Sequence, residues 1–144
     1  MSNLPVGTPI RKIGNIRDVD KFLDKLWPWD WVNDCFGGKI RPTDIDGTVE
    51  RNGFFLYLEG KSIGQELPTG QEIYFKNLTY KLGHGTVALI LWARIVGDPI
   101  MFQMIYEGKV SPIKNCTKEA IRIFCRKWYA HAESHGRFDA QLIK

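Results

Sequence analysis

The sequence lacks the long apolar segments that mark membrane and secreted proteins. Its longest purely apolar run spans residues 87–93, far short of the ~20 residues that a membrane-spanning helix needs. The start of the chain has neither the charged region nor the apolar region of a secretory signal. We therefore expect a protein of the cytoplasm with no membrane partner.

Cysteine is also scarce, and the common catalytic motifs are missing. The three cysteines, Cys35, Cys116 and Cys125, are odd in number and have no CxxC spacing. This does not suit a disulfide framework or a zinc knuckle, but it suits a reducing compartment. The sequence contains no GxSxG motif and no Walker lysine, which argues against serine hydrolases of that type and P-loop enzymes.

The composition is that of one globular domain. The chain has 144 residues, of which 44% are hydrophobic and 25% are charged, enough to bury one core. The net charge of +4 is compatible with a polyanionic partner, although many domains are as basic. Proline and glycine break any period in residues 1–14, which we expect to be a flexible arm before a domain at 15–144.

Periodicity predicts helices and strands in alternation. Apolar residues at helical spacing predict a first helix that Pro28 ends, and a strand pair follows from about 43 to 61. The Thr69-x-x-Glu72 pattern of a capping box predicts the next helix, ended by Gly83. Its expected buried residues are Phe75, Leu78 and Leu82.

The second half predicts two strands and a helix. Residues 86–92 have the composition of a strand buried on both faces, and a turn at 97–99 leads to a strand at 100–106. Thr117 is the expected cap of a long helix. The expected buried stripe of this helix comprises Ile121, Phe124, Cys125, Trp128 and Ala132. The order of elements predicts an α/β fold with a mixed sheet.

Asn52-Gly53 is a strong hairpin signal, because a type I′ turn needs positive φ at both central residues. In the resulting register the numbers of facing residues sum to 105, so Asp46 faces Glu59 and Asp44 faces Lys61. Alternation then places Asp44, Asp46, Tyr57, Glu59 and Lys61 on one face, and Ile45, Val49, Leu56 and Leu58 on the other.

Facing carboxylates repel each other. A divalent cation between Asp46 and Glu59 would offset this, since Mg²⁺ binds carboxylate oxygens. Three alternatives remain open: one carboxylate is protonated, the two side chains splay into solvent, or a bulge shifts the register. Gly60 can leave its carbonyl free for a metal. Lys61 can act on a bound water or form a plain salt bridge with Asp44.

The order Asp, then Glu-x-Lys, then Gly-Gln opening a helix, in "PTDIDGTVERNGFFLYLEGK" and "GQ", resembles the PD-(D/E)xK nuclease superfamily. It is most similar to small phage and prophage nuclease-like proteins and junction-resolvase relatives, over roughly residues 41–82. The resemblance implies a single-domain restriction-endonuclease-like core, αβββαβ, with an additional C-terminal helix. It also implies a bacterial or phage-infected host cell.

By this resemblance Asp46, Glu59 and the Gly60 carbonyl would bind Mg²⁺ or Mn²⁺. Lys61 would act on the attacking water, and Gln71 would contact the site or a substrate phosphate. Asp44 is a competing ligand, and the first helix offers Asp18, Asp20 and Asp24 as a further acid. The sequence departs from the name-giving pattern, because Thr43 separates Pro42 from Asp44.

The implied function is a metal-dependent nuclease that hydrolyses DNA phosphodiester bonds. Cutting directed by DNA structure is expected, because so small a domain has little room for base-reading loops, and a homodimer would supply two cuts. The alternative is an inactive nuclease fold that binds DNA or a partner protein, for example a phage anti-defence factor. A third interpretation is an unrelated α/β binding module in which the Glu-x-Lys arrangement is accidental.

Two further features have a functional and a plain interpretation. Lys118, Arg122 and Arg126 recur every four residues and could follow DNA phosphates, or form a solvated helix face. His131 and His135 have the spacing of a helical metal pair, but the zincin glutamate and a third ligand are missing. We expect them to mark the end of a helix, where imidazolium suits the dipole.

Overall fold

The computed structural model of the protein describes residues 28–135. By its internal contacts the chain divides into two units, 1–44 and 45–144. The predicted arm, the first helix and its three aspartates lie outside the described residues. In the first unit, η2 (Asp30–Phe36) is a short 3-10 helix that ends at Gly37, whose φ is 74°. The sequence analysis predicted neither a helix nor a strand there.

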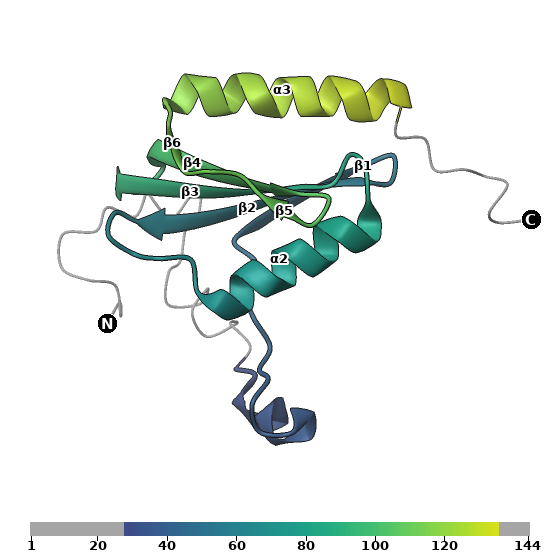
Figure 1. The fold of residues 1–144 in the computed structure, drawn as a ribbon, viewed down its shortest axis with the longest axis vertical. Coiled ribbons are helices and arrows are strands. Elements are labelled where there is room, and N and C mark those ends of the chain that lie inside the picture. The colour runs from purple at the N-terminus through teal and green to yellow at the C-terminus, as the bar shows by residue number, and fades with distance from the viewer. Residues whose placement is uncertain (1–27, 136–144) are drawn as a thin grey trace, which may run out of the picture. The chain divides into compact units, whose positions relative to one another are not determined.

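The second unit is an α/β structure with a six-stranded mixed sheet (Figure 1). Its elements are β1 (Gly47–Arg51), β2 (Phe54–Ser62), α2 (Thr69–Leu82), β3 (Val87–Ile95), β4 (Asp98–Tyr106), β5 (Lys109–Val110), β6 (Lys114–Asn115) and α3 (Lys118–His135). The strand order is β1-β2-β3-β4-β5, and β6 also pairs with β4. Strands β2 and β3 are parallel, and the other pairs are antiparallel.

The two long helices cover opposite faces of this sheet (Figure 1). On the α2 face, Phe75 packs with Tyr57, Ile90 and Trp92. On the α3 face, Trp128 and Ala132 pack with Leu56 and Leu89. Neighbouring residues of β2 therefore enter different clusters, as the alternation of side chains along a strand requires. Among the described residues, no helix has both the length and the apolar character needed to cross a bilayer.

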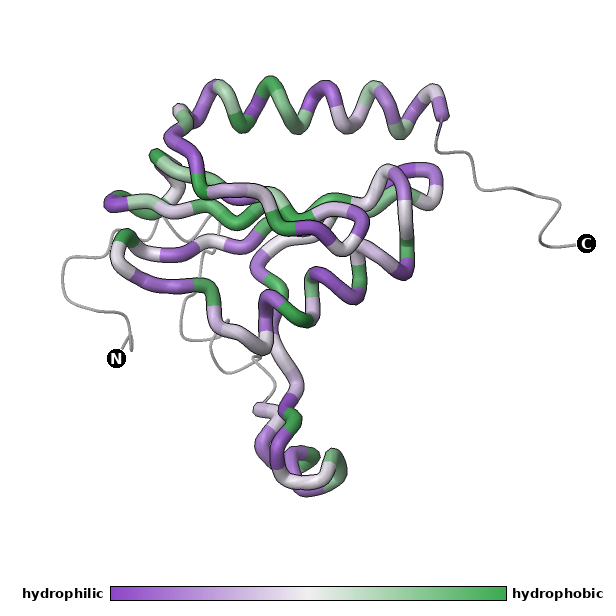
Figure 2. Tube along the Cα trace, in the orientation of Figure 1, coloured by the Kyte–Doolittle hydropathy of each residue, from purple (hydrophilic) through white to green (hydrophobic). Residues whose placement is uncertain are grey.

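Helix α3 follows the sequence closely. The Thr117 hydroxyl accepts a hydrogen bond from the Ala120 N–H at 3.1 Å, so the predicted cap is confirmed. The predicted stripe is also confirmed, since Trp128 and Ala132 are buried and Ile121, Phe124 and Cys125 pack against their cluster. Figure 2 shows hydrophilic and hydrophobic residues alternating along this helix.

Helix α2 differs from the prediction in its N-terminal cap and in the burial of its last residue. It begins at Thr69 as predicted, but no side chain caps it, and the preceding position is occupied by Pro68. Phe75 is buried and Leu78 is partly buried, as expected. The prediction for Leu82 is wrong, because this residue is 43% exposed. It is the last helical residue before Gly83, where the helix ends.

The hairpin is confirmed for five residue pairs, from Gly47–Leu58 to Arg51–Phe54. Asn52 and Gly53 have φ values of 50° and 83°, as a type I′ turn requires. Strand β3 is buried on both faces at its centre, as predicted. Of the three strands that the αβββαβ order places before the second helix, the described residues contain two, β1 and β2.

Candidate functional site

The centre of the candidate site is the Glu59-Gly60-Lys61 segment of β2. Side chains alternate along a strand, so Glu59 and Lys61 project from the same face of the sheet as Tyr57. Tyr57 packs on the α2 face. Glu59 is 4% exposed. Carboxylates are almost never buried so deeply unless they are paired, so its partners decide what this residue can do.

Both partners of Glu59 bond to the same oxygen. The Gln71 side-chain amide, in the first turn of α2, donates a hydrogen bond to Glu59 Oε1 at 3.0 Å. The Lys61 ammonium lies 3.3 Å from that same atom. The predicted association of Glu59, Lys61 and Gln71 therefore occurs in the structure. Lys61 pairs with Glu59, whereas the plain salt-bridge interpretation named Asp44 as its partner.

Two buried oxygens at this place have no hydrogen-bond partner. They are Glu59 Oε2 and Gln71 Oε1, which belong to the two side chains that bond to each other. A buried polar atom without a partner costs about 1–3 kcal/mol, and more for a charged group. The site thus presents oxygen atoms that a donor or a cation would stabilise.

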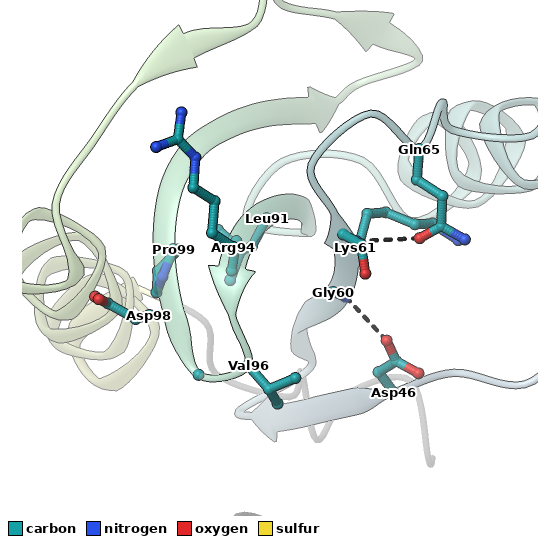
Figure 3. A pocket seen from close by; sticks show the side chains of 12 residues that line it. Asp46, Gly60, Lys61, Gln65, Leu91, Arg94, Val96, Asp98 and Pro99 are labelled. Carbon is teal, nitrogen blue, oxygen red and sulfur yellow. Dashed lines mark hydrogen bonds between the residues drawn. The ribbon is translucent and has the colours of Figure 1, made fainter. Parts of the chain in front are cut away.

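Asp46 lies where the β1–β2 ladder ends, and the predicted pairing does not extend to this residue. The ladder stops at Gly47–Leu58, so Asp46 and Glu59 do not form a facing pair. The Asp46 carboxylate instead accepts a hydrogen bond from the Gly60 N–H, with 2.9 Å between Oδ2 and N (Figure 3). The Asp46 side chain thus occupies the Gly60 N–H, which would bond to the backbone of β1 if the strand continued. The pairing of the two strands therefore ends here.

The end of the ladder also changes the side of a neighbouring residue. Ile45 was predicted on the face of Leu56 and Leu58, but it packs against the cluster of Tyr57 on the opposite face. The alternation therefore fails beyond Gly47. The predicted Asp44–Lys61 pair is likewise absent from the ladder. Asp44 is an exposed residue outside any strand and belongs to the first unit.

Gly60 follows Glu59 in β2, and its N–H is bonded to the Asp46 carboxylate. In an extended strand the N–H and C=O of one residue point to the same side, so the Gly60 carbonyl is directed to the edge where Asp46 lies. A Cβ at position 60 would meet only Asp46 Oδ2, at 3.7 Å, which is ordinary contact. No described protein neighbour therefore requires a glycine at position 60.

A cavity of about 350 Å³ opens beside this edge (Figure 3). Its lining includes Asp46, Gly60, Lys61 and two residues that the sequence analysis missed, Gln65 and Arg94. The Gln65 side chain accepts a hydrogen bond from the Ser62 N–H at 3.0 Å, and its backbone carbonyl accepts one from the Trp92 indole at 2.6 Å. No sequence signal identifies these contacts, because they depend on how the loop folds back.

The acids and the carbonyl fit a hard cation in their chemistry. Glu59 offers an unpartnered oxygen, and Asp46 and the Gly60 carbonyl lie at the adjoining edge. All are oxygen ligands, as Mg²⁺ prefers, and Mg²⁺ commonly binds one or two carboxylates. In the part of the chain that is described, no three His, Cys, Asp or Glu side chains form a group that could hold a metal.

The predicted basic row on α3 is not close to these residues in the fold. Lys118, Arg122 and Arg126 are exposed on the helix that covers the opposite face from α2 (Figure 1). Glu119 lies 3.8 Å from the Arg122 guanidinium and 3.1 Å from that of Arg126. These pairs favour a solvated helix face.

The comparisons with known proteins add no relative. No family model matches the chain, and neither the curated proteins nor the solved structures contain a match.

Proposed function

We propose that the protein is a Mg²⁺- or Mn²⁺-dependent deoxyribonuclease of the PD-(D/E)xK type. The observation that carries the proposal is the state of Glu59: a buried carboxylate with one oxygen bonded by Lys61 and Gln71 and the other without a partner. A site built only for stability would have little use for this arrangement, because a buried ion pair is weak support for a fold.

The topology around Glu59 supports a restriction-endonuclease-like core. Strand β2 carries Glu-x-Lys, α2 follows it, and β3 returns parallel to β2. Helix α2 places Gln71 against the acid, as the resemblance implies. In this proposal α3 is the additional C-terminal helix on the other face.

Each residue has a defined part in hydrolysis. Asp46, Glu59 and the Gly60 carbonyl would hold the ion. When bound, such an ion supplies positive charge at the phosphate and lowers the pKa of a coordinated water. Lys61 presents N–H donors that orient the attacking water or a phosphate oxygen. Gln71 fixes the Glu59 carboxylate and thereby sets the direction of its second oxygen.

The proposed substrate is DNA, recognised by its structure. The cavity beside Asp46 and Lys61 measures about 350 Å³, which is at the lower end of the ~300–1,000 Å³ of small-ligand pockets. It can take a phosphate with part of its nucleotide, but it offers few groups for reading a base sequence. Junctions, flaps or ends are therefore the substrates to test, and a homodimer would cut two strands.

The test is cleavage of branched, flapped, linear and single-stranded DNA in Mn²⁺. We expect the wild-type protein to cut at least one substrate. Glu59→Gln and Lys61→Ala should each lower the cleavage rate about 100-fold or more, as the removal of other groups that stabilise transition-state charge does. Glu119→Gln is the matched control, since Glu119 is exposed on α3, and it should cut normally. Equal cutting by all four proteins would locate the activity elsewhere.

A second candidate is a nuclease fold that binds DNA or a partner protein without cleavage. The observation in its favour is that Asp46 Oδ2 is already bonded to the Gly60 N–H, which uses part of its capacity to bind a metal. Absence of cleavage on every substrate, together with DNA binding that Glu59→Gln leaves unchanged, would favour this candidate over the nuclease.

A further inference from the structure

The three histidines of the chain gather at one place, away from the acid site. His84 lies in the loop after α2, whereas His131 and His135 are in the last turns of α3. The Nε2 atoms of His84 and His131 are 3.0 Å apart. The His131 and His135 rings stack with 4.5 Å between their centroids. The sequence analysis saw only the helical pair, because His84 is 47 positions away from His131.

The two facing rings are held in place by the surrounding structure. The Phe54 ring stacks on His131 at 5.5 Å and meets His84 edge-on at 5.9 Å. Gly85 makes room for Phe54, since a Cβ there would lie 2.4 Å from the Phe54 ring. The Trp128 indole donates a hydrogen bond to the Gly85 carbonyl at 2.8 Å and so ties the His84 loop to α3. These contacts keep the two rings close together, although the His84 side chain is 72% exposed, so a metal ion can reach them.

We propose that His84 and His131 together bind a transition-metal ion such as Zn²⁺ through their Nε2 atoms. With Zn–N bonds of about 2.0–2.1 Å, two nitrogens of a tetrahedral site lie about 3.3–3.4 Å apart. The observed 3.0 Å therefore needs only a small movement of the rings. Without a metal, one ring must donate and the other accept the proton between them.

The surroundings provide further elements of a metal site. Glu107 Oε1 lies 3.8 Å from His84 Nδ1, on the side where a carboxylate commonly supports a metal-binding histidine. A cavity of about 440 Å³ borders His84, Glu107 and His131, which leaves room for water ligands. With two protein ligands the site is open, so the affinity should be modest.

His135 provides an internal control. Its Nδ1 lies 2.7 Å from the Ser134 hydroxyl and 3.3 Å from the His131 carbonyl. These contacts engage Nδ1, and the His135 ring stacks on that of His131 at an interplanar angle of 21°. Within residues 28–135 no three His, Cys, Asp or Glu side chains form a group that could hold a metal, so His135 does not complete the pair. His135 is therefore not a ligand in this proposal.

Zn²⁺ titration by calorimetry tests the site, performed in the Glu59→Gln background so that the acid site does not contribute. We expect one Zn²⁺ per chain, and affinity reduced about tenfold or more by His84→Ala or His131→Ala. His135→Ala should bind nearly as the parent does. Thermal melts without metal identify any variant that fails to fold.

Proton NMR of the Glu59→Gln protein gives a second readout that needs no substitution of a histidine. The imidazole signals of His84 and His131 should shift with Zn²⁺ more than those of His135. No Zn²⁺ binding to the Glu59→Gln protein, equal binding after loss of either proposed ligand, or shifts confined to His135 would each overturn the proposal.

Discussion

The two faces of the sheet are built from the same strands but differ in kind. On the α3 face the buried cluster is apolar, and the one polar group of Trp128 is bonded to the Gly85 carbonyl. On the α2 face, Lys61 is paired with Trp92 in the sheet. Glu59 Oε2 and Gln71 Oε1, which belong to two bonded side chains, both lack a hydrogen-bond partner. The other such oxygen in the described part of the chain, Thr86 Oγ1, belongs to a single neutral hydroxyl. The comparison separates a face that stabilises the fold from a face that keeps an energetically costly arrangement, which we attribute to function.

The largest expected effect is on the α3 face. Trp128→Ala should lower the free energy of unfolding by about 3–5 kcal/mol, because it opens a cavity and leaves the Gly85 carbonyl without its donor. Urea denaturation measures this loss. Trp128→Phe, which keeps most of the packing, should lose clearly less, and equal losses would mean that packing on this face contributes little.

Gly60→Ala should separate stability from cleavage. Its Cβ meets only Asp46 Oδ2 at 3.7 Å, so stability should change by no more than about 1 kcal/mol. Cleavage should fall about tenfold, a change of about 1.4 kcal/mol in the barrier, because the methyl group narrows the approach between Asp46 and the Gly60 carbonyl. Kinetic assays beside thermal melts measure both quantities.

Gly70→Ala is the matched control for that substitution. A Cβ at Gly70 meets nothing within 4 Å, and alanine favours the helix. This variant should cut normally. If both alanine variants cut equally well, the small size of residue 60 has no part in the reaction.

Glu59→Gln should destabilise the metal-free protein less than Trp128→Ala does. The amide keeps an oxygen for the Gln71 donor but leaves the Lys61 ammonium, whose side chain is 11% exposed, without its charge partner, so the free energy of unfolding should fall by about 1–3 kcal/mol. Melts in EDTA measure this loss. A destabilisation larger than that of Trp128→Ala would show that the charged carboxylate is a main support of the fold.

The smallest effects are expected on the outer side of α3. Arg122→Ala and Arg126→Ala each remove an exposed pair with Glu119 and should cost about 0.5 kcal/mol or less. The salt dependence of DNA binding should stay unchanged in the double variant. A decrease in slope of about one per arginine would instead identify them as phosphate contacts.

The sequence predicted the parts of the fold that depend on local signals. Asn52-Gly53 fixes the register because the turn itself imposes the backbone conformation. Helix α3 was predictable for the same reason. Thr117 caps its start, and the apolar residues up to Ala132 recur at the helical period. The two-residue strands β5 and β6 were not predicted, since so few residues show no period.

The contacts among Glu59, Lys61 and Gln71 could be predicted from the sequence, but the arrangement around Asp46 and the cavity residues Gln65 and Arg94 could not. The Glu-x-Lys spacing brings Glu59 and Lys61 to one face, and the resemblance adds Gln71. The register could not reveal that Asp46 would bond the Gly60 N–H and end the ladder, because a side chain there competes with the backbone. His84 and His131 meet only through tertiary packing of a loop on α3, which no local pattern encodes.

Binding of Mn²⁺ tests the central claim most directly. It can be measured by electron paramagnetic resonance, because the signal of the free ion decreases as the ion binds. The wild-type protein and Glu119→Gln should bind the ion equally, whereas Glu59→Gln and Asp46→Asn should each bind it at least about tenfold more weakly. If Glu59→Gln binds Mn²⁺ as tightly as the wild type, or if the wild type does not bind it at millimolar concentration, the buried carboxylate is not a metal ligand.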